Sequence, residues 1–203
     1  MSDCVEGTIE KLLCDVYNEM FSKKKDHFLY FAEEGISFEL WLTTELAMYF
    51  RNEKYNVDFT PGVVIKEEVV GVENQIKTKY SCRYLDLFVS NEIDQCAIEL
   101  KIATPATQSK YNIACRNDIT KLSNISKIST KEKIADYNKI KKLFVLVVVS
   151  KRNKAGYNAN WNEWLDKIYE DSNEKAESLI KYSEFSEKDN EDLTAVVYHK
   201  FVK

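Results

Sequence analysis

Glycine and proline are scarce in this chain, with 5 and 2 among its 203 residues. Flexible linkers are usually built from these residues or from polar low-complexity runs, so the sequence shows no obvious domain boundary. With 44% hydrophobic and 12% aromatic residues, the chain has enough apolar material for one sizeable core. We therefore expect a single domain over residues 1–203.

Cysteine and histidine are also few, and their spacing matches no metal-binding pattern. The 5 cysteines contain no CxxC pair, and their odd number does not indicate a disulfide framework. A zinc site would have only His27 and His199 to draw on. We expect no thiolate or imidazole metal centre and interpret the cysteines as small buried hydrophobic residues; they are Cys4, Cys14, Cys82, Cys96 and Cys115.

No run of about 18 or more apolar residues is present, so no segment predicts a membrane-spanning helix. The opening segment, MSDCVEGTIEKLLCDVYNEM, is acidic and amphipathic, whereas a signal peptide would be basic and then apolar. We therefore expect a cytoplasmic protein without a membrane partner.

Charge is divided unevenly along the chain. Residues 1–100 carry 10 Lys or Arg and 19 Asp or Glu, a net charge of −9; residues 101–160 carry 13 against 3, or +10. Residues 161–203 carry 6 against 11, or −5, which brings the total to −4. A basic segment in an acidic protein fits a phosphate-binding face, and it fits a solvated surface equally well.

Hydrophobic periodicity predicts alternating helices and strands. Helical spacing predicts one helix over 5–22 and a second over 38–50, with Ser37 as the N-cap of the second. Strands are predicted over 63–72, 80–89 and 95–102, and the turn residues SNEID join the last two as a hairpin.

The rest of the chain continues this alternation. Thr104 and Pro105 predict the start of a helix that ends near Leu122. KLFVLVVVS, residues 142–150, is typical of a central strand buried on both faces. Asn160 and Glu163 predict the start of another helix, and LTAVVYHKFV predicts an edge strand that closes the chain. This order predicts an α/β fold with a mixed central sheet flanked by helices.

Charged side chains interrupt the predicted hairpin. If the hairpin closes around residues 91–94, paired residues have numbers that sum to about 185, so Asp86 lies opposite Glu99. Lys101 is two residues beyond Glu99 and shares the face of the two acids. The other face is predicted to be core and carries Leu85, Leu87, Val89, Ile98, Leu100 and Ile102.

Two carboxylates opposed across a sheet repel each other, and in a partly dry site this raises one pKa unless a cation is shared. Asp86, Glu99 and the backbone carbonyl of Leu100 offer the hard oxygen ligands that Mg²⁺ takes. Lys101 would orient a metal-activated water or offset charge that develops on phosphorus. These residue types predict phosphodiester hydrolysis.

Asp86, followed after twelve residues by Glu99-Leu100-Lys101, resembles the active site of the PD-(D/E)XK phosphodiesterase superfamily. The order of elements over about residues 36–150 is similar to the restriction-endonuclease-like core, with Leu85 in place of the family's proline. The resemblance implies a Mg²⁺-dependent nuclease, with Mn²⁺ as a substitute, that acts on DNA or, alternatively, on RNA. Restriction, repair and phage defence are implied settings, and a homodimer is expected if both strands are cut.

A glutamate on the preceding helix completes the metal site in many members of that superfamily. The candidates here are Glu39 and Glu45. Glu39 lies in the first turn, where the helix dipole already accounts for an acid. Glu45 lies at helical spacing from Trp41 and Leu42 on an apolar face, so the cost of burying a carboxylate favours Glu45.

The helix after the third strand would place the basic segment beside this site. Candidate phosphate contacts are Gln108, Lys110, Arg116 and Lys121, and each also fits an ordinary exposed helix residue. Asp118 and Lys121, three residues apart, are interpreted as a surface ion pair. Two alternatives stay open: an exposed edge hairpin with a simple salt bridge to Lys101, and a nuclease-like fold that binds nucleic acid or protein without turnover.

Overall fold

Three helices open the described part of the chain, α1 (Ile9–Lys23), α2 (Lys25–Glu34) and α3 (Glu39–Asn52). The predictions of helices at 5–22 and 38–50 are confirmed where the structure describes them, whereas α2 was not predicted. Phe38, and not Ser37, is the N-cap of α3, and it makes no side-chain capping hydrogen bond, so that detail was wrong. The computed structural model describes residues 9–34, 36–70, 76–103, 108–130, 137–151, 180–187 and 190–202.

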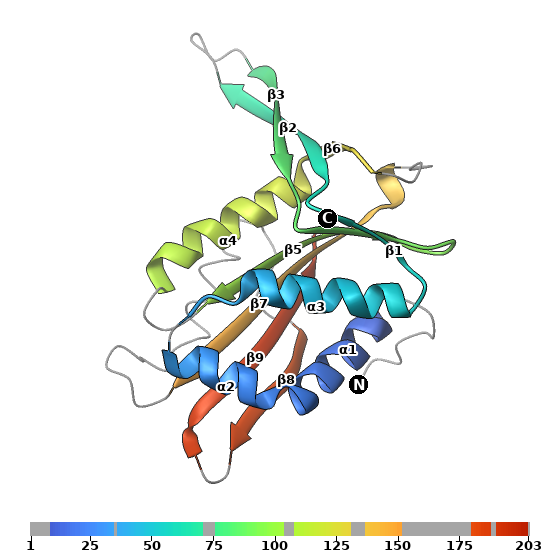
Figure 1. Ribbon diagram of the computed structural model, residues 1–203. Helices are drawn as coiled ribbons and strands as arrows, with labels where there is room; N and C mark the ends of the chain where they lie inside the picture. The colour runs from blue at the N-terminus through green and yellow to red at the C-terminus, as the bar shows by residue number, and fades with distance from the viewer. Residues whose placement is uncertain are drawn as a thin grey trace.

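A six-stranded mixed sheet forms the centre of the molecule, in the order β1-β4-β5-β7-β9-β8 (Figure 1). β5 and β7 are parallel, and the other neighbours are antiparallel. The helix α4 (Gln108–Ser123) lies between β5 and β7 in the chain. The strands are β1 (Asn56–Phe59), β4 (Leu87–Ser90), β5 (Gln95–Ala103), β7 (Lys141–Lys151), β8 (Ile180–Glu187) and β9 (Asn190–Phe201).

The mixed α/β class is therefore confirmed, and so is the central position of the 142–150 run, which lies within β7 between β5 and β9. The closing strand was wrongly placed at an edge. β9 is flanked by β7 on one side and by β8 on the other, and β8 was not predicted from its acidic sequence. The predicted helix start at Thr104 and Pro105 and the predicted helix after Asn160 lie outside the described residues.

A second, three-stranded sheet projects from the body and is called the arm here (Figure 1). It consists of β3 (Ile76–Tyr84), β2 (Gly62–Val70) and β6 (Ile125–Ile128), in that order. A short 3-10 helix, η3 (Tyr137–Lys139), precedes β7. The strand predicted over 80–89 is therefore two strands in two sheets, β3 in the arm and β4 in the body.

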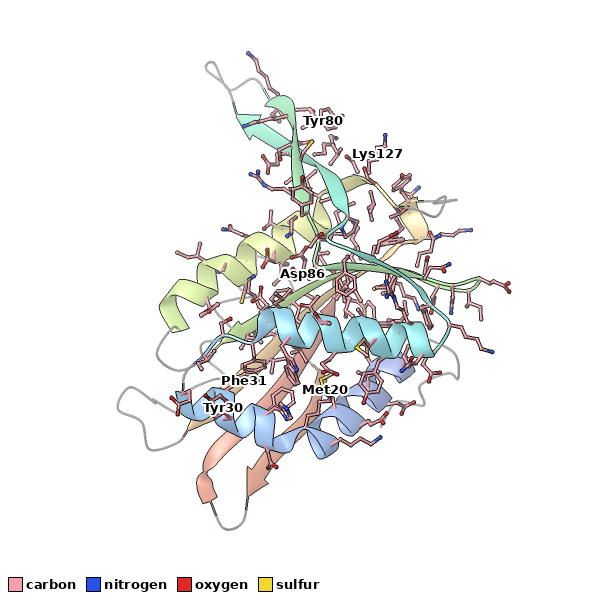
Figure 2. All side chains as sticks on the ribbon, in the orientation of Figure 1. Met20, Tyr30, Phe31, Tyr80, Asp86 and Lys127 are labelled. Carbon is pink, nitrogen blue, oxygen red and sulfur yellow. The ribbon has the colours of Figure 1, made fainter. Side chains whose placement is uncertain are left out.

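The bend between arm and body falls at Asp86. On the facing strand, Thr60 has a left-handed φ of 44° and precedes Pro61, which stops β1 before β2 begins. Backbone pairing nevertheless continues across the bend: Thr60 N–H donates to the carbonyl of Asp86 and Leu85 N–H to that of Pro61, both at 3.1 Å. The segments around Thr60 and Asp86 therefore bend together, and Asp86 lies between the arm and the body (Figure 2).

Both faces of the central sheet are covered. The three N-terminal helices pack on the face that carries Leu87, Val89, Ile98, Leu100 and Ile102, which confirms the prediction for these positions. Leu85 was assigned to the same face and belongs instead to the opposite core, because the bend interrupts the alternation of β4. That opposite core consists of α4, part of the arm and β-strand side chains such as Phe88, Ala97 and Phe144.

The cysteine interpretation is partly confirmed. Cys96 and Cys115 are buried, whereas Cys82 on β3 is exposed and was wrongly expected inside. Cys4 and the side chain of Cys14 lie outside the described residues. Among the helices that the structure describes, none combines the length and the apolar character needed to cross a membrane.

Candidate active site

The β4–β5 hairpin brings Asp86 to Glu99. Four residue pairs from Leu87–Ile98 to Ser90–Gln95 have numbers that sum to 185, as the sequence predicts. Asp86 directly precedes β4, one residue beyond the last of these pairs, and its charge acts on Glu99. The backbone N–H of Leu100 donates to Oδ2 of Asp86 at 2.7 Å, which ties the aspartate to β5 although it lies outside the regular strand.

Glu99 is a buried acid, and only one of its two carboxylate oxygens has a partner among the described residues. The residue is 1% exposed, and its Oε2 lies 2.7 Å from Nζ of Lys121. Its Oε1 is buried and has no hydrogen-bond partner among the described residues. Burial, and next the negative charge of Asp86, raise the pKa of Glu99 to about 8, although Lys121 acts in the opposite direction. The site therefore resists the ionised form of this carboxyl.

Lys101 lies on the same face as Glu99 and is held between two other acids. Its Nζ is 3.3 Å from Oε1 of Glu39 on α3 and 3.2 Å from Oδ2 of Asp118 on α4. Burial alone lowers the pKa of Lys101, but the carboxylates of Asp118 and Glu39 outweigh it and raise the pKa above its ordinary value. The amine is therefore a fixed positive charge.

Lys121 links α4 to both sheets. Its Nζ contacts Oε2 of Glu99, lies 3.4 Å from Oδ1 of Asp118 and donates to the backbone carbonyl of Tyr84 at 2.9 Å. The predicted pair of Asp118 and Lys121 exists, but the surface interpretation was wrong, because their side chains are only 15% and 16% exposed. Lys121 therefore belongs to the site and is not available as a peripheral phosphate contact in this arrangement.

The cluster has more negative than positive charge. Burial is the main cause that raises the pKa of Asp86 and of Glu39, as it does for Glu99. With four carboxylates and two ammonium groups, the fully ionised set has a charge of −2 (2 − 4). We call these six residues the carboxylate cluster: Glu39, Asp86, Glu99, Lys101, Asp118 and Lys121.

The donor types suit a hard divalent cation. In the described part of the chain, no group of three or more His, Cys, Asp or Glu side chains is arranged to hold a metal ion. Asp86 and Glu99 nevertheless adjoin each other, and Oε1 of Glu99 lacks a hydrogen-bond partner among the described residues. The N–H and the C=O of a strand residue point to the same neighbouring strand. The carbonyl of Leu100 is therefore directed to the same side of β5 as its N–H, which binds Asp86. Two carboxylates and a carbonyl fit Mg²⁺, which keeps several of its waters.

The structure removes the premise of the preference for Glu45 over Glu39. Oε1 of Glu45 lies 2.5 Å from Nζ of Lys24, so a lysine at the α1–α2 junction provides the charge partner that the burial argument assumed to be missing. Glu39 is the α3 glutamate that contacts Lys101. The first-turn position that seemed to explain Glu39 through the helix dipole also directs its side chain to the cluster.

The remaining predicted phosphate contacts lie along α4. Arg116 is partly buried, and the side chains of Gln108 and Lys110 lie outside the described residues. Sequence reasoning missed Asp118 as a site residue. A signal was present: Asp118 is three residues after Cys115 and four before Leu122, both buried, so helical spacing places it beside the buried stripe of α4.

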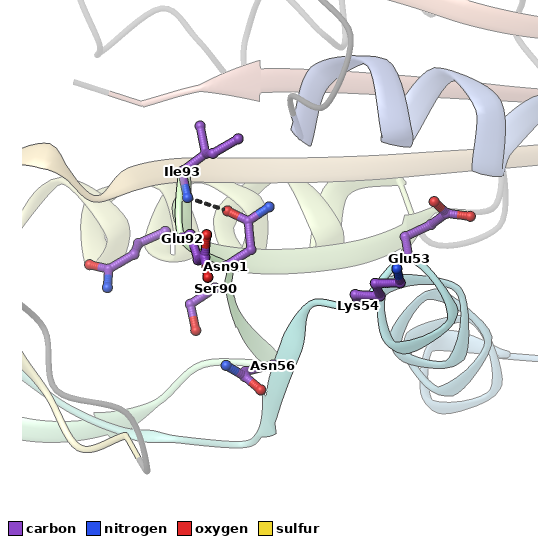
Figure 3. Close-up of a pocket in the computed structure, with 8 residues that line it drawn as sticks. Glu53, Lys54, Asn56, Ser90, Asn91, Glu92 and Ile93 are labelled. Atoms are coloured by element: carbon purple, nitrogen blue, oxygen red, sulfur yellow. Dashed lines mark hydrogen bonds between the residues drawn. The ribbon is translucent and has the colours of Figure 1, made fainter.

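A separate pocket lies at the other end of β4, near the C-terminal end of α3 (Figure 3). In it, the N–H of Ile93 donates to Oδ1 of Asn91 at 2.8 Å. The pocket shares no residue with the carboxylate cluster; it is lined by Glu53, Lys54, Asn56, Ser90, Asn91, Glu92, Ile93 and Gln95.

Compared with protein-family models, curated proteins and solved structures, the chain gives no match. Adjacent carboxylates bind hard cations, and a buried, permanently charged lysine stabilises negative charge. Both properties suit reactions at phosphate.

Proposed function

We propose that the chain is a Mg²⁺-dependent nuclease with a restriction-endonuclease-like fold that hydrolyses phosphodiester bonds in DNA. The observation that carries the proposal is the convergence of Asp86 and Glu99 at the bend, with the Lys101 ammonium in the same buried cluster. The element order supports it as well. With β2, β3 and β6 set apart in the arm, the central sheet follows α3 with the antiparallel strands β1, β4 and β5, and after α4 with β7 parallel to β5. This is similar to the core that the resemblance implies.

Each residue of the cluster has a role in this proposal. Asp86, Glu99 and the Leu100 carbonyl would hold the cation, which when bound supplies an activated water and screens phosphate charge. The cation would take over from Lys121 the neutralisation of Glu99. Lys101, whose pKa is raised, acts as a fixed positive charge that stabilises the phosphate in the transition state, and it does not act as a base.

Glu39 and Asp118 position Lys101 from two different helices. Neither needs to touch the substrate for this role. Because α3 and α4 pack on opposite faces of the central sheet, the packing of both helices fixes the position of the ammonium group. Loss of either acid is expected to reduce catalysis less than loss of Lys101 itself.

Cleavage assays test the proposal. Plasmid, linear DNA and RNA are incubated with Mg²⁺, with Mn²⁺ or with EDTA. We expect cleavage only with a divalent metal, and Asp86→Asn or Lys101→Met should lower the rate by about 100-fold or more. Glu45→Gln is the matched control, since it removes a glutamate of the same helix that pairs with Lys24, and it should keep the activity. Cleavage that persists in EDTA, or in both cluster variants, would reject the assignment.

The plasmid products also report the assembly. One site cuts one strand, so a homodimer is proposed only if supercoiled plasmid is converted directly to linear DNA. Accumulation of nicked circles first would indicate that each chain acts alone. RNA cleaved in preference to DNA would replace the proposed substrate and leave the proposed chemistry unchanged.

A second function is favoured by one observation. Both lysines already neutralise carboxylates of the cluster, with Lys121 2.7 Å from Glu99, and a fold in which they stay there would bind nucleic acid or protein without turnover. The two candidates separate in the same experiment. No cleavage of any substrate, together with no change in melting temperature on adding Mg²⁺, supports the binding module.

A further inference from the structure

The arm exposes one strand almost completely. All residues of β3 except Ser81 are exposed, on both faces of the strand. Strands in globular proteins normally bury at least one face. The neighbouring strands β2 and β6 do bury one face, since Val63, Ile65 and Ile128 pack into the core beneath α4. The outward face of the arm is therefore a surface that the rest of the described chain leaves open.

Strand register gathers tyrosine and lysine on that outward face. Lys66 pairs with Tyr80, and Val64 pairs with both Cys82 and Lys127, so these side chains share one face. Tyr84 is four residues from Tyr80 and projects to the same side. The two tyrosines are 62% and 72% exposed. We call Lys66, Tyr80, Tyr84 and Lys127 the tyrosine face; Figure 2 labels Tyr80 and Lys127.

The arm is basic although the whole chain is acidic. Its described strands carry 5 Lys or Arg and 2 Glu, a net charge of +3 (5 − 2), in a protein of net charge −4. All the basic side chains are exposed; they are Lys66, Lys77, Lys79, Arg83 and Lys127. Lys66 and Lys127 lie on the outward face together with Glu68, whose Oε1 is 3.9 Å from Nζ of Lys66, whereas Lys77, Lys79 and Arg83 pair with residues of the opposite face. The net positive charge of the whole arm would attract a phosphate backbone.

The tyrosine face also begins at the carboxylate cluster. Tyr84 ends β3 two residues before Asp86, and its carbonyl accepts the hydrogen bond from Lys121, which contacts Glu99. A strand of nucleic acid that lies along β3 would therefore end near the cluster.

We propose that the tyrosine face binds the unpaired bases of single-stranded DNA and leads that strand to the carboxylate cluster. The inference rests on the proposed nuclease function for what happens to the strand at the cluster. Exposed aromatic rings stack on bases only where the bases are not paired, whereas lysines alone would serve duplex and single strand alike. The substrate class is therefore single-stranded DNA, or a single-stranded segment of a larger DNA.

Binding without cleavage tests this separately from catalysis. Fluorescence anisotropy of a labelled oligonucleotide is measured in EDTA with the full chain, against the same sequence as duplex. We expect tighter binding of the single strand. Tyr80→Ala and Tyr84→Ala should each weaken it by about 5- to 150-fold, the range of base stacking on one aromatic ring, while Tyr80→Phe keeps the ring and the affinity.

Two further variants complete the design. Lys127→Ala should lower the slope of log affinity against log salt by about 0.7, as expected for one phosphate contact on a single strand. Tyr30→Ala removes a tyrosine on α2 that is 55% exposed and should leave binding unchanged. Circular dichroism establishes that each variant is folded before its affinity is compared.

The inference is overturned if duplex binds as tightly as single strand, if both tyrosine variants keep full affinity, or if Tyr30→Ala loses as much as Tyr80→Ala. It is also overturned if the wild type forms a dimer that Tyr80→Ala dissociates while no DNA is bound, because the face would then be a contact between copies. Failure of the nuclease proposal looks different: DNA is bound through the tyrosines and is not cleaved with Mg²⁺.

Discussion

Replacement of Glu99 by glutamine should make the metal-free protein more stable at alkaline pH while it abolishes the proposed activity. Glutamine keeps the shape of the side chain and removes the charge that the site resists. Burial and Asp86 raise the pKa of Glu99 from 4.5 to about 8, so the folded state keeps a proton that the unfolded state gives up between these pH values. The wild-type protein therefore loses stability as pH rises from 4.5 to 8, and the loss is complete above pH 8.

The magnitude follows from the same shift. At 1.36 kcal/mol per pH unit, the change from 4.5 to about 8 sets a ceiling of about 5 kcal/mol. Relaxation around a buried charge reduces such values, so we expect Glu99→Gln to gain about 1–3 kcal/mol above pH 8 and close to nothing at pH 4.5. Lys121 is not left without partners, because Asp118 and the carbonyl of Tyr84 remain within reach.

Chemical denaturation in EDTA, followed by tryptophan fluorescence across this pH range, measures the effect. Glu45→Gln is the matched control, since it removes an equal charge that is paired with Lys24, and it should change stability by no more than about 1 kcal/mol at any pH. A Glu99→Gln protein that is no more stable than wild type above pH 8 would refute the argument that ionisation of this buried carboxyl destabilises the folded state.

Three further predictions follow from the described residues. Mg²⁺ should raise the melting temperature of the wild type, with about 1.4 kcal/mol of stabilisation at ten times the Kd. The melting temperature of Asp86→Asn should stay unchanged. An equal shift in both proteins would place the cation elsewhere. Peptide mapping after alkylation of the native protein should find Cys82 modified and Cys96 and Cys115 protected. Of these three described thiols, only Cys82 is exposed, and burial raises the pKa of Cys115 to about 12. Rapid modification of either buried thiol would contradict the packing around it. Phe144→Ala should cost about 3–5 kcal/mol of unfolding free energy, because Phe144 is fully buried between the sheet and α4, and a loss below about 1 kcal/mol would argue against this core.

The hairpin register could be predicted from sequence because two short-range rules determine it. The turn residues SNEID fix where the chain reverses, and a period of two then decides which residues face each other. That is why the pairing of β4 with β5 and the adjacency of Asp86 and Glu99 agree with expectation. The β-branched run of β7 was predictable for a related reason, since a strand covered on both faces must be apolar at every position.

The split of residues 80–89 into β3 and β4 could not be read in the same way. Tyr84, Leu85 and Asp86 continue a strand-like sequence, and the bend depends on Thr60 and Pro61 on the facing strand. Pairing between segments that are distant in the chain carries no local signal. The assignment of Leu85 to the wrong face and the placement of β9 at an edge are errors of this kind, because both depend on partners that periodicity does not identify.

The burial argument that preferred Glu45 over Glu39 lost its premise for a different physical reason. The cost of burying a carboxylate was judged from neighbours on its own helix, but the partner that removes this cost, Lys24, comes from the α1–α2 junction. Charge partners reach across elements, so a single-helix argument is incomplete. Asp118 was misjudged in the same way, as its pairing with Lys121 was visible at helical spacing while the sheet that buries both residues was not.

The bend, the excess of negative charge and the exposed arm are consequences of one arrangement. Because the two bent strands turn at Asp86, the acid lies where the buried sheet ends and the exposed arm begins. Two carboxylates in the middle of the body would be too dry to accept a hydrated cation, and two on the arm would be too solvated to gain from it. At the corner, Glu99 supplies the buried partner and Lys121 a positive charge that a divalent cation would replace. The same corner joins the tyrosine face to the cluster. The position at which the ionised carboxylates are unfavourable without a cation is therefore also the position that a bound DNA strand would reach.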